Sequence, residues 1–344
     1  MDARSRMVLN GVTRLPTGSF GMLLYRRVPV VLGILLGMLA PASAGDSRTI
    51  AVTTIIEHPA LDAARRGLQA GLREHGLKPG RGVELVFRSA GGSRAQATTI
   101  AEDFVAMKAD VIVPISTPSA QATAMATTSI PIVFAAVTDP LAAALVEDLQ
   151  APGGNVTGVS DQLPVADHLD LILEVAPGLS RLGVVADPDE ASAQSLLEAL
   201  RAAAEPRGIE IVTRPARDRA EVRAAAADLS REVDALYLSP DDTVASALEE
   251  VVAVGEAHDL PVFASDVHGV PRGALAGLGF NYFEVGRQAA LLVKRVLDGE
   301  APGSIPIQTV KATELYVNPA AAGRMGVDLP EAVVKRAAAT FESR

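Results

Sequence analysis

The sequence predicts an α/β protein built from two doubly wound parallel-sheet lobes that are joined by a hinge of three crossings. Three observations support this fold class. Short aliphatic runs alternate with alanine-rich helical stretches along the chain, which is the pattern of βαβ units around parallel sheets. The alternation falls into two successive sets of similar size. About 300 residues follow an N-terminal leader, which is more than one hydrophobic core usually covers.

The leader is expected to direct export. Arg26 and Arg27 precede an uncharged run, residues 28–40, which ends in Pro41-Ala-Ser-Ala44 with the small-x-small spacing of a signal-peptidase site. The apolar run is too short to span a bilayer, so a signal peptide over residues 1–44 is preferred to a transmembrane anchor. The chain has no cysteine, which excludes a disulfide and a lipid-modified N-terminal cysteine. We therefore expect a periplasmic protein that is cleaved near Ala44.

The N-terminal lobe is predicted to comprise residues 45–158 and 283–305. Its strands are expected where aliphatic or β-branched residues run together, because strands of a parallel sheet are buried on both faces. In chain order, the expected strands are Ile50–Ile55, Val83–Arg88, Val111–Pro114 and Ile132–Ala136, and the expected helices are Pro59–His75, Ser93–Lys108 and Pro118–Thr128.

The C-terminal lobe is predicted to comprise residues 159–282 and 306–344, with the same alternation. The expected strands are Leu182–Asp187, Ile209–Thr213, Ala235–Leu238 and Val262–Ala264, and the expected helices are Glu190–Glu205, Arg219–Arg231 and Thr243–His258. Two sets of this similar size indicate two lobes rather than one large sheet, with right-handed crossovers.

The chain is expected to pass between the lobes three times. Gly153-Gly154-Asn155 supplies a turn before the first crossing, and residues 277–281 form the second. A helix over Phe283–Leu297 then returns to the first lobe, and residues 302–306 lead into a last strand over Ala312–Val317. Three crossings between two α/β lobes form a hinge, so a ligand is expected in the cleft between them.

Composition and motifs limit the kinds of ligand and partner that the chain is expected to bind. The formal net charge is −10, whereas nucleic acids and anionic lipids require a basic surface, so we expect a small-molecule ligand and no nucleic acid. Tryptophan is absent and aromatic residues make up 3% of the chain, which leaves little for a stacking platform. The five histidines are scattered, and no HExxH, Gly-x-Ser-x-Gly or phosphate-loop motif occurs. We expect a monomer with no cofactor, no metal and no catalytic residue.

Several ordered motifs extend over nearly the whole chain after the leader. They are Glu57–Asp62, Thr117–Gln121, Pro131–Pro140, Pro152–Ser160, Thr243–Ser246, Ala264–Asp266 and Arg272–Ala276. Together they resemble the ABC-transporter substrate-binding protein family that includes the TrpX-like tryptophan/tyrosine-binding proteins. The resemblance implies a periplasmic-binding-protein-like type I fold and a receptor that delivers a solute to an ABC permease in the inner membrane. The chain departs from the family pattern at Asp242, where asparagine is frequent, and at Asn281, where aspartate is frequent.

The ligand-binding candidates of the first lobe lie at the carboxyl ends of predicted strands. They are Glu57, Ser116, Thr117, Ser119, Ala120, Val137, Thr138 and Asp139. The run from Ser116 opens a helix, where hydroxyls and free N–H groups suit a carboxylate, although an ordinary N-cap is the alternative. Asp139 could accept from a ligand ammonium or cap the next helix. For Glu57, the resemblance favours cleft lining, and a helix-dipole partner is the alternative.

The remaining candidates lie at the predicted crossings and in the second lobe, where most are carboxylates. They are Asp161, Asp241, Asp242, Ser265, Asp266 and Asn281. Asp241 and Asp266 have the strongest claim by position, whereas Asp161 and Asn281 could contact the ligand or stabilise the hinge. Acidic groups that face helix N-termini suit a zwitterion, whose ammonium meets Asp or Glu while its carboxylate meets N–H groups.

These observations predict the periplasmic solute-binding component of an ABC import system, which binds an amino acid or a related small polar or zwitterionic solute in the interlobe cleft. Two other classes stay open. A ligand-sensing protein that signals to a membrane partner would have the same cleft. An α/β enzyme would have to turn over the ligand rather than only retain it.

Overall fold

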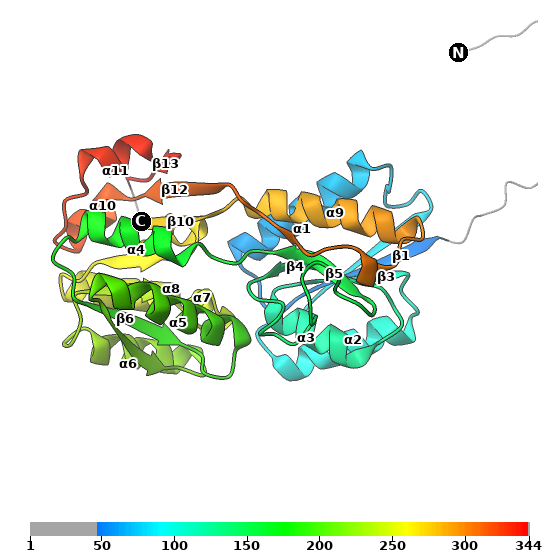
Figure 1. Cartoon of the computed structure of the whole chain (residues 1–344), viewed down its shortest axis with the longest axis horizontal. Helices are drawn as coiled ribbons and strands as arrows, with labels where there is room; N and C mark the ends of the chain where they lie inside the picture. Colours follow the sequence, from blue (N-terminus) through cyan, green and yellow to red (C-terminus); the bar gives the residue numbers. More distant parts are fainter. Residues whose placement is uncertain (1–46, 343–344) are drawn as a thin grey trace, which may run out of the picture. The chain divides into compact units, whose positions relative to one another are not determined.

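The computed structural model describes residues 47–342, and its strands form two sheets (Figure 1). The first sheet has the order β11-β5-β4-β3-β1-β2, and the second has the order β13-β12-β10-β9-β8-β6-β7. Every pairing is parallel except that of β10 with β12, which is antiparallel. The two α/β sheets confirm the predicted fold class. The predicted leader, residues 1–44, lies outside the described residues.

The first sheet and its helices make up the first lobe. Its strands are β1 (Arg48–Thr54), β2 (Val83–Ser89), β3 (Val111–Ile115), β4 (Ile132–Val137), β5 (Val156–Ser160) and β11 (Gln308–Thr309). Its helices are α1 (Pro59–Glu74), α2 (Arg94–Ala106), α3 (Thr117–Ala126) and α9 (Tyr282–Leu297). All residues of β3, β4 and β5 are buried, which explains why these strands read as continuous apolar or small-residue runs rather than as an alternation.

The second sheet and its helices make up the second lobe. Its strands are β6 (Arg181–Ala186), β7 (Glu210–Pro215), β8 (Ala235–Leu238), β9 (Val262–Ala264), β10 (Ala276–Phe280), β12 (Thr313–Val317) and β13 (Ala339–Thr340). Its helices are α4 (Val165–Val175), α5 (Ala191–Ala204), α6 (Arg219–Leu229), α7 (Asp242–Ser246), α8 (Leu248–Ala257), α10 (Pro319–Arg324) and α11 (Glu331–Arg336). Short 3-10 turns cover Glu205–Arg207, Val267–Gly269 and, in the first lobe, Pro302–Ser304.

Several elements of the second lobe differ from the sequence prediction, and residues 277–281, expected to form the second crossing, mostly belong to β10. The single helix expected over residues 243–258 is two helices, α7 and α8, because the backbone leaves helical geometry at Ala247 with φ −119° and ψ 19°. Helix α4 was not predicted at all. It buries Val165, Leu169 and Ile172, whose spacing places them on one helical face.

The chain passes from one sheet to the other three times. It leaves the first sheet between β5 and α4, returns between β10 and α9, and leaves again between β11 and β12. The third crossing comes later than the predicted lobe boundary at residue 306. Gln308 and Thr309 still pair with Val159 and Ser160 of β5, so they belong to the first sheet.

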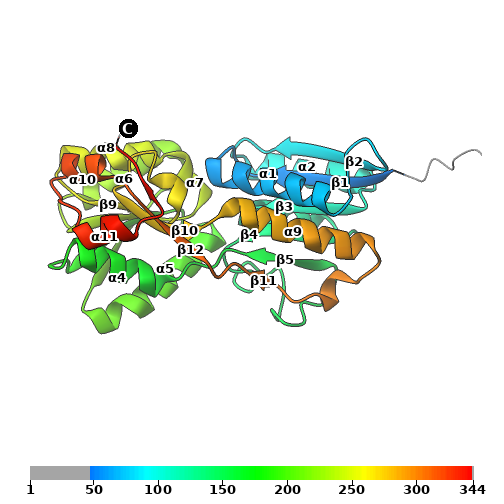
Figure 2. The same ribbon diagram turned by 90° about the horizontal axis from the view of Figure 1, so that it is seen from above.

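Helix α9 follows the second crossing and packs against α1 at very short range, and both views show the two helices side by side (Figure 2). Glycines allow this approach. A Cβ at Gly67 would lie 1.9 Å from Phe283 O, and a Cβ at Gly286 would lie 1.9 Å from Ala64 O. The same face of α1 buries Leu68 and Leu72, each of which stabilises the lobe by roughly 1.5–3 kcal/mol relative to exposure.

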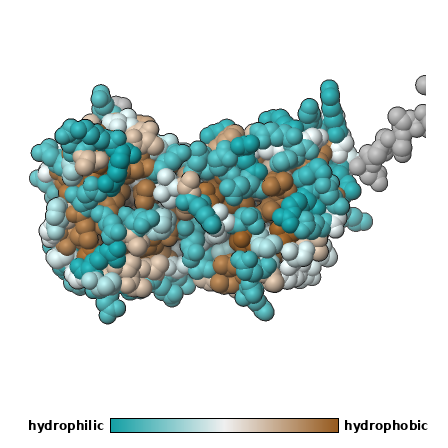
Figure 3. All heavy atoms as spheres, turned by 45° about the horizontal axis from the view of Figure 1, so that its top comes forward, coloured by the Kyte–Doolittle hydropathy of each residue, from teal (hydrophilic) through white to brown (hydrophobic). Residues whose placement is uncertain are grey.

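On the face of the molecule shown in Figure 3, the surface is mainly hydrophilic, and hydrophobic residues lie in separate spots among polar ones. The large apolar side chains that are exposed include Phe87, Met125 and Leu141. No helix between residues 47 and 342 has both the length and the apolar character needed to cross a membrane.

Candidate functional site

A cavity of about 40 Å³ lies between the two lobes, at the carboxyl ends of their parallel strands. It is lined by His58, Ala60, Leu61, Ser116, Thr117, Ala136, Thr138, Asp161, Glu190, Ser192, Pro240, Asp242, Ala245, Asp266 and Tyr282. Pockets that hold small molecules usually measure roughly 300–1,000 Å³. The two walls therefore lie close together in this structure, and a ligand of amino-acid size requires them to separate.

The first-lobe wall is made of hydroxyls and strained backbone. Ser116 follows β3 with φ 89°, and Ala136 interrupts the register between β4 and β5 with φ 54°. Both values lie in the left-handed region that residues with a Cβ seldom adopt, and such strain is concentrated at functional sites. Thr117 begins α3 beside Ser116, and Thr138 follows the bulge at Ala136. The wall thus presents hydroxyls together with a helix N-terminus whose first N–H groups lack helical partners.

At the first crossing, Asp161 is held by a residue from the second crossing. The Tyr282 hydroxyl donates to Asp161 Oδ2 at 2.7 Å, whereas Asp161 Oδ1 is buried with no partner among the described residues. Burial raises the pKa of Asp161 to about 6, and the hydrogen bond from Tyr282 acts against that rise. One of the two oxygens is therefore positioned by Tyr282, and Thr138 lies beside the carboxyl.

The second-lobe wall carries Glu190 and Asp242 in direct contact. Asp242 N–H donates to Glu190 Oε2 at 3.2 Å and to Oε1 at 3.3 Å, and the Ser192 hydroxyl donates to Glu190 Oε1 at 2.5 Å. Burial, followed by the nearby Asp241, raises the pKa of Asp242 to about 8. Burial, followed by Asp242, also raises the pKa of Glu190 well above its usual value. At neutral pH this wall therefore binds protons that ordinary carboxyls would release.

Asp266 differs from the other carboxyls of the cavity. Its Oδ1 accepts the backbone N–H groups of His268 at 2.5 Å and Gly269 at 3.1 Å, which caps the 3-10 turn that follows. Burial acts to raise the pKa of Asp266, but the His268 hydrogen bond and the nearby His58 and His268 rings outweigh it and bring that pKa to about 2. Asp266 therefore has a lower pKa than Asp161 and Asp242.

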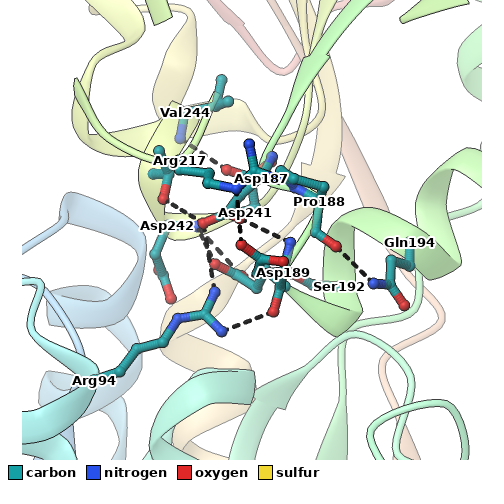
Figure 4. Close-up of polar contacts among 12 residues, drawn as sticks. Arg94, Asp187, Pro188, Asp189, Ser192, Gln194, Arg217, Asp241, Asp242 and Val244 are labelled. Atoms are coloured by element: carbon teal, nitrogen blue, oxygen red, sulfur yellow. Dashed lines mark hydrogen bonds and ion pairs between the residues drawn. The ribbon is translucent and has the colours of Figure 1, made fainter. Parts of the chain in front are cut away.

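Three sets of polar contacts connect the two lobes beside the cavity. Arg94 of α2 donates to Asp189 O at 2.7 Å and to Asp187 Oδ2 at 3.4 Å, as Figure 4 shows. Ser195 of α5 donates to Asp139 Oδ2 at 2.8 Å. Arg272 Nη1 lies 2.8 Å from His58 Nε2, and burial lowers the pKa of His58.

The structure brings together six of the residues that the sequence singled out. Ser116, Thr117, Thr138, Asp161, Asp242 and Asp266 all line the cavity. Ser119, Ala120, Val137 and Ser265 are buried in the lobes and do not line it. Asn281 is exposed and caps α9, with Oδ1 accepting Phe283 N–H at 3.1 Å. Glu57 is exposed and borders a separate surface pocket.

Two carboxylates that the sequence favoured have structural roles instead. Asp241 is fully buried and caps α7, with Oδ1 accepting Val244 N–H at 2.8 Å and Oδ2 accepting Asp187 N–H at 3.3 Å (Figure 4). Asp139 Oδ1 accepts the N–H groups of Leu141 and Ala142, each at 3.0 Å. All four oxygens already have partners, and neither residue lines the cavity.

Several lining residues escaped the sequence analysis, above all Glu190, Ser192 and His58. Glu190 directly precedes α5, which was predicted to begin at that position, so it carried the same strand-end signal as the chosen aspartates. Its role as a wall of the cavity depends on the pairing of β6 with β8, which brings the segments after the two strands together. Among residues 47–342, no group of acidic or histidine side chains is arranged to hold a metal ion.

Comparison with known proteins identifies the group to which this chain is related. The family model described as ABC transporter substrate binding protein matches residues 49–341. This chain belongs to that family. It is 35% identical over 271 residues to a tyrosine-binding protein of Clostridioides difficile strain R20291, and the match covers 79% of each chain.

Two solved structures of substrate-binding proteins are also similar. A Streptococcus pneumonia ABC domain in complex with L-Trp is 31% identical, with a TM-score of 0.83 over 86% of this chain and 100% of that one. The ligand-free, open structure of a substrate-binding protein with adhesive properties from Clostridium difficile is 33% identical, with a TM-score of 0.67 over the same shares. At similar identity, the present fold superposes more closely on the tryptophan complex than on the open structure.

Membership of the family confirms several predictions. The chain is a substrate-binding protein of ABC import, and its family acts outside the cytoplasm and is not enzymatic. The two lobes with a cavity between them are the arrangement that such a receptor requires, because a ligand enclosed by two lobes can be carried and then released by opening. The lobe boundaries and the binding residues stay predictions.

Proposed function

We propose that this substrate-binding protein binds an aromatic amino acid, tyrosine or tryptophan, in the interlobe cavity and delivers it to an ABC permease in the inner membrane. The similarity to a tyrosine-binding protein and to a complex with L-Trp supports this ligand class. The observation that carries the proposal is the chemistry of the cavity. The first-lobe wall presents hydroxyls, a helix N-terminus and Asp161, the second-lobe wall presents three more carboxyls, and Leu61 and Tyr282 add apolar surface for a ring.

Thermal denaturation and calorimetry test the ligand class directly. We expect L-tyrosine or L-tryptophan to raise the melting temperature in proportion to the logarithm of its concentration once the site is saturated. Myo-inositol serves as the negative control, because the two walls suit a zwitterion rather than a neutral polyol. Stabilisation by inositol with no response to either aromatic amino acid would contradict the proposal.

We further propose that the mature protein resides in the periplasm after removal of residues 1–44. The sequence around Pro41-Ala-Ser-Ala44 supports cleavage at that point. Edman sequencing or mass spectrometry of protein released from the periplasm by osmotic shock should find a chain that begins at Gly45. Recovery of the intact chain in the membrane fraction would contradict this location.

A further inference from the structure

Strand β2 (Val83–Ser89) is an edge of the first sheet, since it pairs with β1 on one side and with no other strand among residues 47–342. It runs along the margin of the first lobe (Figure 2). The turn before it covers only the start of this edge, where Gly80 N–H donates to Val83 O at 2.9 Å. Farther along, Glu84 is exposed and Phe87 is 39% exposed. Such an edge is a template on which another strand can pair.

The hydrogen bonds at the two ends of β2 show which backbone groups face the open side. Arg48 N–H donates to Gly82 O, and Ala90 N–H donates to Thr54 O, each at 2.9 Å. Backbone groups of successive strand residues point to opposite sides, so the even-numbered residues from 82 to 90 bond to β1. The N–H and C=O groups of residues 85 and 87 therefore point away from the sheet.

The residues of this edge are complementary to themselves when the strand is read outward from Val86. Leu85 and Phe87 are its immediate neighbours, and Glu84 and Arg88 are the next pair. In an antiparallel pairing of two copies centred on Val86, Leu85 of each copy lies opposite Phe87 of the other. Glu84 of each copy then lies opposite Arg88 of the other, in the closer, non-hydrogen-bonded type of pair, whose Cα atoms are about 4.5 Å apart.

We propose that β2 pairs antiparallel with β2 of a second copy of this chain, in the register centred on Val86. Four backbone hydrogen bonds form between residues 85 and 87 of the two copies, and two Glu84–Arg88 ion pairs flank them. Pairing centred on Glu84 or on Arg88 would instead oppose like charges, so the charges select this register. The dimer differs from the monomer that the sequence led us to expect.

Arg88 is already oriented on the surface of the lobe. Its guanidinium group forms an ion pair with Asp103 of α2 and lies 5.6 Å from the centre of the Phe104 ring. The Arg88 side chain is nevertheless 39% exposed, and a guanidinium group has five N–H donors, so it can contact Asp103 and a second carboxylate together. Little side-chain freedom is then lost when Glu84 of the second copy arrives.

The pairing leaves the interlobe cavity free. The cavity lies at the carboxyl ends of the parallel strands, and antiparallel pairing places those ends of the two sheets in opposite directions. Each copy can therefore bind its ligand separately, and the proposal does not depend on which ligand that is.

Sedimentation equilibrium tests the association of the two copies. Two paired edge strands bury less than the roughly 1,200 Å² typical of stable complexes, so we expect a weak dimer. The mean mass should rise from one chain toward two between about 1 μM and about 500 μM protein. The mass of a single chain throughout this range would overturn the proposal.

Charge reversal tests the register. Glu84→Arg and Arg88→Glu should each weaken self-association by about tenfold or more, because both ion pairs become pairs of like charge. An equimolar mixture of the two variants should dimerise about as well as the parent, since both pairs are then attractive. Two variants that are merely misfolded would not restore each other. Self-association that is unchanged in both variants, or that the mixture does not restore, would overturn this pairing.

A matched variant and hydrogen exchange complete the test. Glu198→Arg makes the same charge change at an exposed position of α5 in the second lobe, and it should self-associate like the parent. In the parent, the N–H groups of Leu85 and Phe87 should exchange about fivefold more slowly in concentrated than in dilute protein, whereas that of Val86 should not change. Exchange at Leu85 and Phe87 that is independent of concentration would show that a dimer, if formed, uses another surface, and would overturn the proposal.

Discussion

The two lobes share a βα architecture, but they contribute different proportions of hydroxyls and carboxyls to the cavity between them. The first lobe contributes Ser116, Thr117 and Thr138, which are hydroxyl residues at the ends of β3 and β4. The second lobe contributes carboxyls, of which Asp242 binds a proton near neutral pH and Asp266 is ionised. Similar strand ends can therefore bind different ends of one ligand. The lobes also differ in their packing, since the first depends on α9, which arrives through the second crossing.

The largest expected effect concerns that packing. Gly286→Ala places a Cβ 1.9 Å from Ala64 O, so α1 and α9 must separate. We expect the first lobe to lose about 3 kcal/mol or more of its free energy of unfolding, while the second lobe keeps its own core. Denaturant unfolding followed by hydrogen exchange should show the loss in β1–β5 first. Gly178→Ala is the control, because a Cβ there meets no atom within 4 Å, and equal stability of the two variants would contradict the packing argument.

The next prediction uses the pH dependence of stability to distinguish Asp242 from Asp266. The pKa of Asp242 is raised to about 8, so its contribution to stability is present below its unfolded pKa and is lost as pH rises through about 8. The pKa of Asp266 is lowered to about 2, so its contribution is present above the unfolded value and is lost as pH falls through about 2.

The ligand-free protein should therefore lose about 1–3 kcal/mol of stability between about pH 5 and about pH 8. Asp242→Asn should reduce this loss, and saturating L-tyrosine should offset it in the parent protein. Urea titrations at a series of pH values provide the measurement. A loss that is unchanged in Asp242→Asn would show that Asp242 is not the group that titrates.

A smaller effect tests whether the first lobe binds the ligand carboxylate. Ser116→Gly removes a hydroxyl that has no partner and relieves the strain of φ 89°, so the variant should be at least as stable as the parent. Calorimetry should show about tenfold weaker binding of L-tyrosine and little change for tyramine, which has no carboxylate. An equal loss for both ligands would place Ser116 against some other part of the ligand.

The smallest effect concerns closure. Arg94→Ala removes the bonds from α2 to Asp187 and Asp189, which join the lobes at the edge of the cavity. Arg94 is half exposed, so we expect only about a threefold loss of apparent affinity, through a shift toward the open form. Small-angle scattering of the ligand-free protein should then report a larger mean radius. Arg223→Ala removes an exposed ion pair within the second lobe and is the control.

Much of the fold could be predicted because parallel strands carry a local signal. The uninterrupted apolar runs in β3 and β4 show burial on both faces without reference to their neighbours. The break at Ala247 and the short strand β11 were missed. The first depends on how α7 and α8 pack, and the second consists of two residues that form a strand only because β5 lies beside them.

The candidate site was predicted less completely than the fold. Strand-end position drew attention to Asp139 and Asp241, yet in both residues the oxygens accept from nearby N–H or hydroxyl groups. Asp242, adjacent to Asp241, has the unpaired oxygen. Adjacent residues at a helix start point in different directions, and a sequence pattern does not show which of two neighbouring carboxyls caps the helix.

The sequence by itself determined the class of protein, because hydrophobic periodicity and ordered motifs are properties of neighbouring residues. Only the tertiary structure decided which side chains form the site. Asp161, Glu190 and Asp242 are far apart in the chain and meet through sheet pairing and the hinge crossings. Their pKa values follow from burial among one another, and burial is set by the packing of two lobes rather than by any local pattern.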